Sequence, residues 1–473
     1  MCQTGMAITI VRKNKHGRRF FTPAVIALVL FLVVPVWAGT ERKTDGLLMQ
    51  ATGITREDVH GVSTKESLDL FDVYVMAVSG TERMAIEGEY ALQADARRRQ
   101  ALGLFLPKIS LKATKTLTEV DRTTPSTQRS MVSLYARQNL LTGLDEYASF
   151  RGSAAEQRFR RYLLNDSAGK LLQEMATVYL RALQIERTLK NREKTLDHYR
   201  GVAAELRRRV AVGRSRQSEL LRTNSQIFKI QAEIESLQSA YVQARSLLTV
   251  ISGVPREKRL VEEVCLPPAP EVPEDMTKLV ESRYDVRAAL EELEISRTRL
   301  LAAQGGHLPS VYLEGTYRLY QQYETGRDYW AGIGAELPIF TGGITTARVS
   351  EAASVKRQAE LRLDQTRRVA RQEIEETYST YTSSMHEMES FKKSLDAAEN
   401  NYRLILGEYR LNLVTLIDVF DALTALESAR DDYERTVLEH CQSRVRLGVA
   451  TGELLGPGIR VLRERAVERS AGQ

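Results

Sequence analysis

Histidine and cysteine are the side chains of this sequence that most readily do chemistry, and their surroundings argue against a catalytic role. Five histidines lie beyond residue 38, namely His60, His198, His307, His386 and His440. The chain has no His-Glu-x-x-His motif, no Cys-x-x-Cys motif and no glycine-rich loop of the kind that cradles phosphate. His198 and His386 lie in charged helical patterns, and His307 precedes Leu-Pro as a corner residue would. We therefore expect neither an enzyme, nor a cofactor, nor a metal site.

The cysteines leave one pairing open. Cys2 lies in an N-terminal segment that we expect to be removed, so the mature chain keeps Cys265 and Cys441. An oxidising compartment would allow a disulfide between them. Two cysteines so far apart in a long chain are more often free or buried thiols, and that is the interpretation we favour from the sequence.

A more informative pattern is the alternation of polar and apolar side chains in two predicted hairpins, about 107–141 and 309–340. Over 311–322 the apolar residues at odd positions alternate with polar ones, which include Glu314 and Arg318. A period of two is typical of a strand with one apolar and one polar side. Because charged side chains on one face of a strand need water, we expect Glu314 and Arg318 to face an aqueous lumen.

Each hairpin is followed by long helical patterns, over 143–251 and 343–450. Apolar residues recur in steps of four and three over 171–210, and only Arg192 breaks the seven-residue repeat. This spacing is typical of a coiled coil. The first helix runs about 70 residues to a break at Gly213, which corresponds to ~100 Å at 1.5 Å per residue.

The two halves of the chain repeat one another. LPKISL at 106–111 recurs as LPSVYL at 308–313, and VAVGRSRQSELLR at 210–222 recurs as YRLNLVTLIDVFD at 409–421. A third landmark, ARQNLLTGL, recurs as AELPIFTGG. Landmarks in the same order at an offset of about 200 residues indicate a duplicated unit.

The expected organisation follows from the duplication. It comprises a signal peptide (1–38), an N-terminal extension (39–65), a first repeat (66–252), a linker (253–276), a second repeat (277–450) and a C-terminal tail (451–473). Each repeat should contain an approach helix, a hairpin, a long helix and a return helix. The approach helices are expected over about 66–104 and 277–304.

The N-terminal segment has the features of a secretory signal peptide. Basic residues between Arg12 and Arg19 precede the apolar run AVIALVLFLVV, and Val36-Trp37-Ala38 offers a cleavage site. The alternative is a transmembrane anchor, although the run is near the short limit for spanning. No cysteine stands directly after the run, so lipid attachment at a new N-terminus is not expected. The pattern therefore indicates export of the mature chain.

Composition excludes other classes of protein. The chain of 473 residues is 43% hydrophobic and 27% charged, which is globular rather than disordered. Its net charge of +6 is modest, and basic and acidic residues are interspersed. We therefore do not expect a nucleic-acid partner.

Strand polarity and export together favour a membrane barrel shared between chains. Strands of about 10–13 residues with an apolar face, a polar face and aromatic residues at their ends suit an outer-membrane barrel. Four strands cannot close a barrel, because the smallest bacterial barrels have eight, so several chains must share one. The alternative is a structural periplasmic coiled coil without a channel.

These residues resemble the TolC-like outer membrane efflux proteins over about 66–450. The resemblance is carried by LPSVYLEGTY, by AELPIFTGG before a long helix, and by GEYRLNLVTLIDVFDALTALESARDDYE, with VAVGRSRQSELL as the first-half copy. Asn412 stands where the family usually has glycine, and asparagine also tolerates the left-handed conformation. Tyr284 replaces a usual proline.

The resemblance implies a mainly α-helical homotrimer with a 12-stranded β-barrel, four strands from each chain, continued by an α-helical periplasmic tunnel. It further implies a position in the outer membrane of a Gram-negative cell, in contact with outer-membrane lipid. The partners would be a periplasmic adaptor and an inner-membrane transporter of an efflux or type I secretion system. The cargo and the class of pump stay open.

The resemblance also assigns roles to the helical turns. The adaptor should dock on two tips, which are Val212-Gly213-Arg214 and Leu411-Asn412-Leu413. Inner helices near the tips should close the tunnel at rest, and the flanking charged residues are candidates for this gate. They are Arg207, Arg208, Glu408, Arg410 and Asp418.

Overall fold

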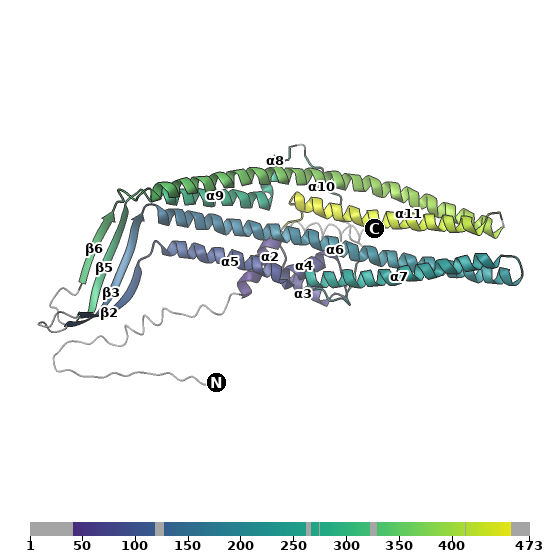
Figure 1. Cartoon of the computed structure of the whole chain (residues 1–473), viewed down its shortest axis with the longest axis horizontal. Helices are drawn as coiled ribbons and strands as arrows, with labels where there is room; N and C mark the ends of the chain where they lie inside the picture. Colours follow the sequence, from purple (N-terminus) through teal and green to yellow (C-terminus); the bar gives the residue numbers. More distant parts are fainter. Residues whose placement is uncertain are drawn as a thin grey trace, which may run out of the picture. The chain divides into compact units, whose positions relative to one another are not determined.

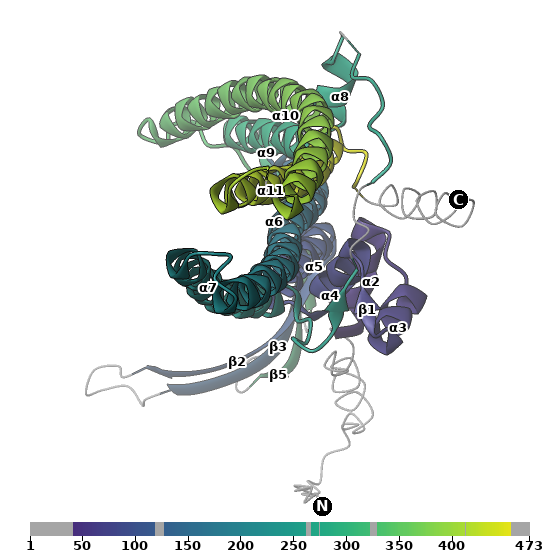
Figure 2. The same ribbon diagram turned by 90° about the vertical axis from the view of Figure 1, so that its right-hand side faces the viewer.

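Two helices of 67 residues each, α6 (Asp145–Ala211) and α10 (Ile344–Arg410), dominate the chain. A computed structural model describes residues 41–118, 127–261, 266–273, 275–321, 329–411 and 413–455. Each long helix reverses into a return helix, α7 (Gln217–Ser252) after α6 and α11 (Leu416–Ala450) after α10. The views in Figures 1 and 2 show α6 beside α7 and α10 beside α11. The expected pairs of long and return helices are confirmed.

The approach helices differ from the expectation, because each is broken once. In the first half α4 (Leu70–Gly80) ends at Thr81 before α5 (Glu82–Gly103), and in the second half α8 (Thr277–Ser282) ends at Arg283 before α9 (Tyr284–Gly305). Thr81 and Arg283 are both extended, with ψ of 139° and 143°. The break is therefore part of the duplication. In the second half, the Arg283 guanidinium stabilises the break by ion pairs to Asp285 and Glu373.

The four expected strands form one antiparallel sheet in the order β2-β3-β5-β6. They are β2 (Lys108–Thr118), β3 (Thr127–Thr142), β5 (Ser310–Gln321) and β6 (Tyr329–Glu336). β6 ends at Glu336, before Leu337 and Ile339, whereas the sequence predicted that the second hairpin extends to about residue 340. Pro338 between them cannot donate to a strand ladder, and Ile339 is 94% exposed.

The register places both apolar stripes on one face of this sheet. Leu313 is paired with Ile333, and Gly315 with Ala331. Directly opposed residues share a face because successive side chains alternate between faces. The alternation predicted over 311–322 is confirmed in β5, and β6 shares its two faces.

The sheet meets the helices where two glycines touch. A Cβ on Gly143 would lie 2.0 Å from the carbonyl oxygen of Gly305, and Gly143 has φ of +53°. Only glycine allows so close an approach of two backbones. This contact fixes the start of α6 of the first repeat against the end of α9 of the second.

The main core forms where the N-terminal helices, the long helices and the linker meet. It includes Val73, Leu171, Met175, Leu183 and Val445, all nearly inaccessible to solvent. Two short elements seal it, β1 (Ser67–Leu68) pairing in parallel with β4 (Arg259–Leu260). Helices α2 (Glu41–Thr52) and α3 (Arg56–Thr64) precede β1. The chain divides into two units, Met1–Lys43 and Thr44–Gln473, and the features below belong to the second.

Two buried arginines of the return helices, Arg245 in α7 and Arg444 in α11, hold the linker between the two repeats. They stand 199 residues apart, which is an offset of the duplication. Arg245 donates to the carbonyl of Arg256 at 2.8 Å, and Arg444 donates to that of Pro267 at 2.7 Å. A buried guanidinium needs such acceptors, because an unsatisfied buried charge is costly. The repeat was visible in the sequence, but the role of these arginines was not.

Cys441, near Arg444 in α11, is buried and disulfide-bonded, so the expectation of free thiols is wrong. The sequence separation of two cysteines says little about their distance in a fold whose linker returns along the helices. The Arg444–Pro267 hydrogen bond brings the linker against this part of α11.

We predict that the partner of Cys441 is Cys265, two residues before Pro267. Peptide mapping by mass spectrometry without reductant should recover a cross-linked peptide that contains both residues and disappears on reduction. Recovery of Cys441 cross-linked to Cys2, or to a second copy of itself, would contradict the assignment.

Several expectations fall outside the described residues. They are the signal peptide (1–38), the loop tips, Cys265, Asn412 and the tail beyond 455. Within the described ranges, no helix combines the length and the apolar character needed to cross a membrane.

Candidate functional site

The first helical turn reverses the chain through a left-handed glycine. Gly213 has φ of +72°, and no atom lies within 4 Å of where its Cβ would be. The amide of Arg214 donates to the carbonyl of Arg209 at 2.8 Å, which closes the end of α6 in the manner of a Schellman motif. Val212 next to the glycine is 68% exposed. The turn therefore presents its side chains to solvent.

The second turn closes with the equivalent hydrogen bond. The amide of Leu413 donates to the carbonyl of Glu408 at 3.0 Å, and both residues are shifted by 199 from their first-half counterparts. Leu411 and Leu413 are each 71% exposed. A capping box then starts α11, in which Thr415 and Asp418 exchange hydrogen bonds.

The gate candidates are not brought together as ion pairs. Within the part of the chain that the structure describes, none of Arg207, Arg208, Glu408, Arg410 and Asp418 forms a salt bridge. Asp418 accepts the Thr415 amide at 2.7 Å and the Thr415 hydroxyl at 2.6 Å, and these hydrogen bonds lower the pKa of its carboxyl. Its carboxylate is thus engaged in starting its own helix.

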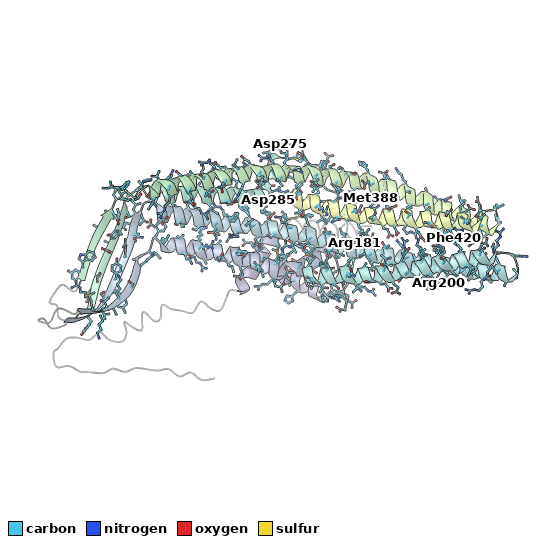
Figure 3. The ribbon with its side chains drawn as sticks, in the orientation of Figure 1. Arg181, Arg200, Asp275, Asp285, Met388 and Phe420 are labelled. Carbon is cyan, nitrogen blue, oxygen red and sulfur yellow. The ribbon has the colours of Figure 1, made fainter. Side chains whose placement is uncertain are left out.

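A contact that sequence reasoning missed joins the two helical hairpins, α6–α7 and α10–α11, near their turns. The Arg209 guanidinium lies 5.2 Å from the ring centroid of Tyr409 while also pairing with Glu205 at 2.6 Å. Beneath it one apolar cluster contains residues of both hairpins, including Tyr199 and Phe420 with ring centroids 5.2 Å apart. Figure 3 labels Phe420 on α11. The feature of the sequence that could have indicated this contact is the aromatic residue Tyr409 in the last turn of α10.

Arg192, the residue that interrupts the heptad pattern, lies in a cluster of charged side chains. Arg192 on α6 lies 3.3 Å from Glu233 of α7, and 3.8 Å and 2.6 Å from Glu427 and Asp431 of α11. Burial raises the pKa of the Glu427 and Asp431 carboxyls, against the lowering effect of Arg192. Arg192 therefore links α6 and α7 to α11, the return helix of the second repeat.

The polar face of the sheet is a network of charged and aromatic side chains. The Tyr135 hydroxyl donates to Glu314 at 2.8 Å, and the Lys112 ammonium lies 4.2 Å from the Tyr135 ring centroid. Arg137, paired with Glu314 in the register, lies over the Tyr312 ring at 4.1 Å. The polar side chains of β5 are half-buried, whereas the apolar face exposes Leu313 and its neighbours.

The strand register gives a labelling prediction. Glu314→Cys and Arg318→Cys should react in intact oligomers with a membrane-impermeant thiol reagent, because their side chains share the polar face, whereas Leu313→Cys should not. Labelling is read by mass shift on a gel. The variants are made in a background that lacks Cys265 and Cys441, so that only the introduced thiol can react. Equal labelling of all three positions would overturn the assignment of faces.

The histidines play packing roles where they contact other groups. The His440 ring stacks on Tyr381 with centroids 4.9 Å apart, and burial lowers the pKa of its imidazole. His198 packs edge-on against Tyr402. Among the described residues, no three His, Cys, Asp or Glu side chains are grouped as metal ligands.

Comparison with known proteins identifies the arrangement. The family model described as "Outer membrane efflux protein" matches residues 276–453. Nodulation protein T of Rhizobium leguminosarum bv. viciae is 25% identical over 199 residues, which is 41% of each chain. The proteases secretion protein PrtF of Dickeya chrysanthemi is 23% identical over 64% of this chain and 70% of its own length. The match to nodulation protein T thus spans about two fifths of that relative.

Solved structures agree on the fold. The CmeC outer membrane channel of Campylobacter jejuni superimposes with a TM-score of 0.74 at 14% identity, covering 95% of both chains. The duplicated helical hairpins and the four-stranded sheet therefore define a subunit of the channel-tunnel fold. The resemblance to the outer membrane efflux proteins that the sequence motifs indicated is confirmed.

Proposed function

We propose that this protein is the exit duct of an efflux or type I secretion system. Three copies would share a 12-stranded barrel in the outer membrane, and their long helices would form a tunnel in the periplasm. Cargo would pass passively from an inner-membrane transporter through an adaptor that docks on the helical turns. The protein would catalyse no reaction itself.

The observation that carries the proposal is that one face of the four-stranded sheet is apolar and exposed. Ile109, Leu111, Leu313, Tyr317 and Ile333 share that face and are all exposed in the single chain. A contiguous apolar surface of this kind needs lipid or protein to cover it. Edge strands β2 and β6 offer unpaired backbone groups, which neighbouring copies would pair to close a barrel.

The test is fractionation followed by electrical recording. The protein should be extracted by detergent from outer membranes as a heat-modifiable trimer, and the purified trimer should conduct ions across planar lipid bilayers. Recovery from the soluble periplasm, without conductance, would favour the alternative of a structural coiled coil.

We further propose that the Arg209–Tyr409 contact contributes to the resting gate, in the region where we expected it from the sequence. Tyr409→Leu keeps an apolar side chain but removes the aromatic ring under the guanidinium. A cation–π contact contributes about 0.5–2 kcal/mol, so the open population should rise about 2- to 30-fold.

Single-channel recording in planar bilayers measures this change, and Tyr409→Phe is the matched control because it retains the ring. Glu408 and Arg410 are the next residues to test by charge reversal. A Tyr409→Leu channel that conducts like the unmodified one would place the gate elsewhere.

A further inference from the structure

The two duplicated turns have diverged in charge. The matched windows 205–222 and 404–421 are related by the offset of 199. The first contains six arginines and two carboxylates, a formal charge of +4, whereas the second contains one arginine and three carboxylates, a formal charge of −2. Two turns with the same backbone therefore present different chemistry.

Five of the arginines around the first turn are exposed, namely Arg207, Arg208, Arg214, Arg216 and Arg222. None of the five has a salt bridge or hydrogen-bond partner for its side chain within the described residues. The sixth, Arg209, is engaged by Glu205 and Tyr409. The carboxylates of the second turn do not neutralise the five, although both hairpins share one apolar cluster.

The second turn is apolar where the first is basic. Leu404, Leu411, Leu413 and Ile417 are exposed around it, compared with Val212 and Leu221 around the first. Neither the turn hydrogen bonds nor the apolar cluster requires arginine at the five positions. Clustered like charges repel one another and oppose compaction, so a cluster without a partner destabilises the chain that carries it.

We propose that the arginine cluster of the first turn, Arg207, Arg208, Arg214, Arg216 and Arg222, binds an acidic surface of the periplasmic partner protein. The guanidinium is suited to this because it forms paired hydrogen bonds with a carboxylate. The second turn supplies apolar contact instead. This proposal rests on the proposed function, since it names the chemistry of the partner that docks on the turns.

The first experiment reverses the charge. A variant with Arg214→Glu, Arg216→Glu and Arg222→Glu, which leaves the gate candidates Arg207 and Arg208 in place, should assemble into outer-membrane trimers whose conductance in planar bilayers is unchanged. Export in cells should fall about tenfold or more, because like charges would then face each other across the interface. The same substitutions to Gln should give a smaller loss, and reversal of the exposed Arg99 and Arg368, far from the turns in sequence, should give none.

The second experiment selects suppressors of the reversed variant and sequences the genome. Compensating changes from Asp or Glu to Lys or Arg in one periplasmic protein are expected. Suppressors confined to this chain, or normal export by the reversed trimer, would overturn the proposal.

Two further outcomes would show that the arginine cluster binds something other than a periplasmic partner protein, and either would reject the proposal. Raised conductance of the reversed trimer would show that the arginines pair with a neighbouring copy. Loss of binding to vesicles of anionic phosphatidylglycerol that the unmodified trimer does bind would indicate a lipid surface. Failure of the unmodified trimer to conduct would instead contradict the proposed function itself.

Discussion

Gly213→Val is expected to abolish export while trimer assembly and outer-membrane insertion persist. Gly213 adopts φ of +72°, a region that a β-branched residue enters at a cost of about 1–2 kcal/mol. No neighbouring atom would clash with the new Cβ, so the whole effect comes from backbone strain at the turn. That strain is too small to unfold a large trimer but large enough to displace the docking surface that we propose.

The matched control is Gly213→Asn, because asparagine tolerates the left-handed region. It should retain export, and Gly213→Ala should lie between the two. Export is measured in cells, and trimers are verified by their heat-modifiable migration. Normal export by a verified Gly213→Val trimer would show that the first turn is not a docking surface.

Arg192→Gln is expected to loosen the packing of α6 against α11. Breaking a fully buried ion pair costs about 3–5 kcal/mol, and the partial exposure of these groups reduces the expectation to about 2 kcal/mol. Amide hydrogens around residues 185–200 and 423–436 should therefore exchange roughly 30-fold faster. Arg200→Gln is the control, since its pair with Asp197 is exposed and should contribute little.

The Arg192→Gln defect should depend on pH in a defined direction. Burial raises the folded-state pKa of Glu427 and Asp431, so their protonation favours the packed state, and this contribution is lost as the pH rises through those pKa values. Removing Arg192 raises both pKa values further. The difference in exchange between variant and unmodified protein should thus be largest at neutral pH and shrink on acidification. A difference independent of pH would rule out the carboxylates as its cause.

The sequence by itself determined the elements and their repetition. Steps of four and three specify a helix that packs along one stripe, and a period of two specifies a strand with two unlike faces, so α6, α10 and the polar face with Glu314 could be predicted. The glycine at the first turn was equally legible, because few other residues adopt positive φ. Signals of this kind are local, and the chain carries them in any surroundings.

Only the tertiary structure decided which distant residues meet. The sequence shows that Arg192 interrupts the heptads, but the three carboxylates that pair with it come from two other helices. The same holds for Arg209 over Tyr409, for the disulfide of Cys441 and for the arginines that hold the linker. Such contacts depend on how the long helices are set against one another over many turns, and no pattern within a single helix records that offset.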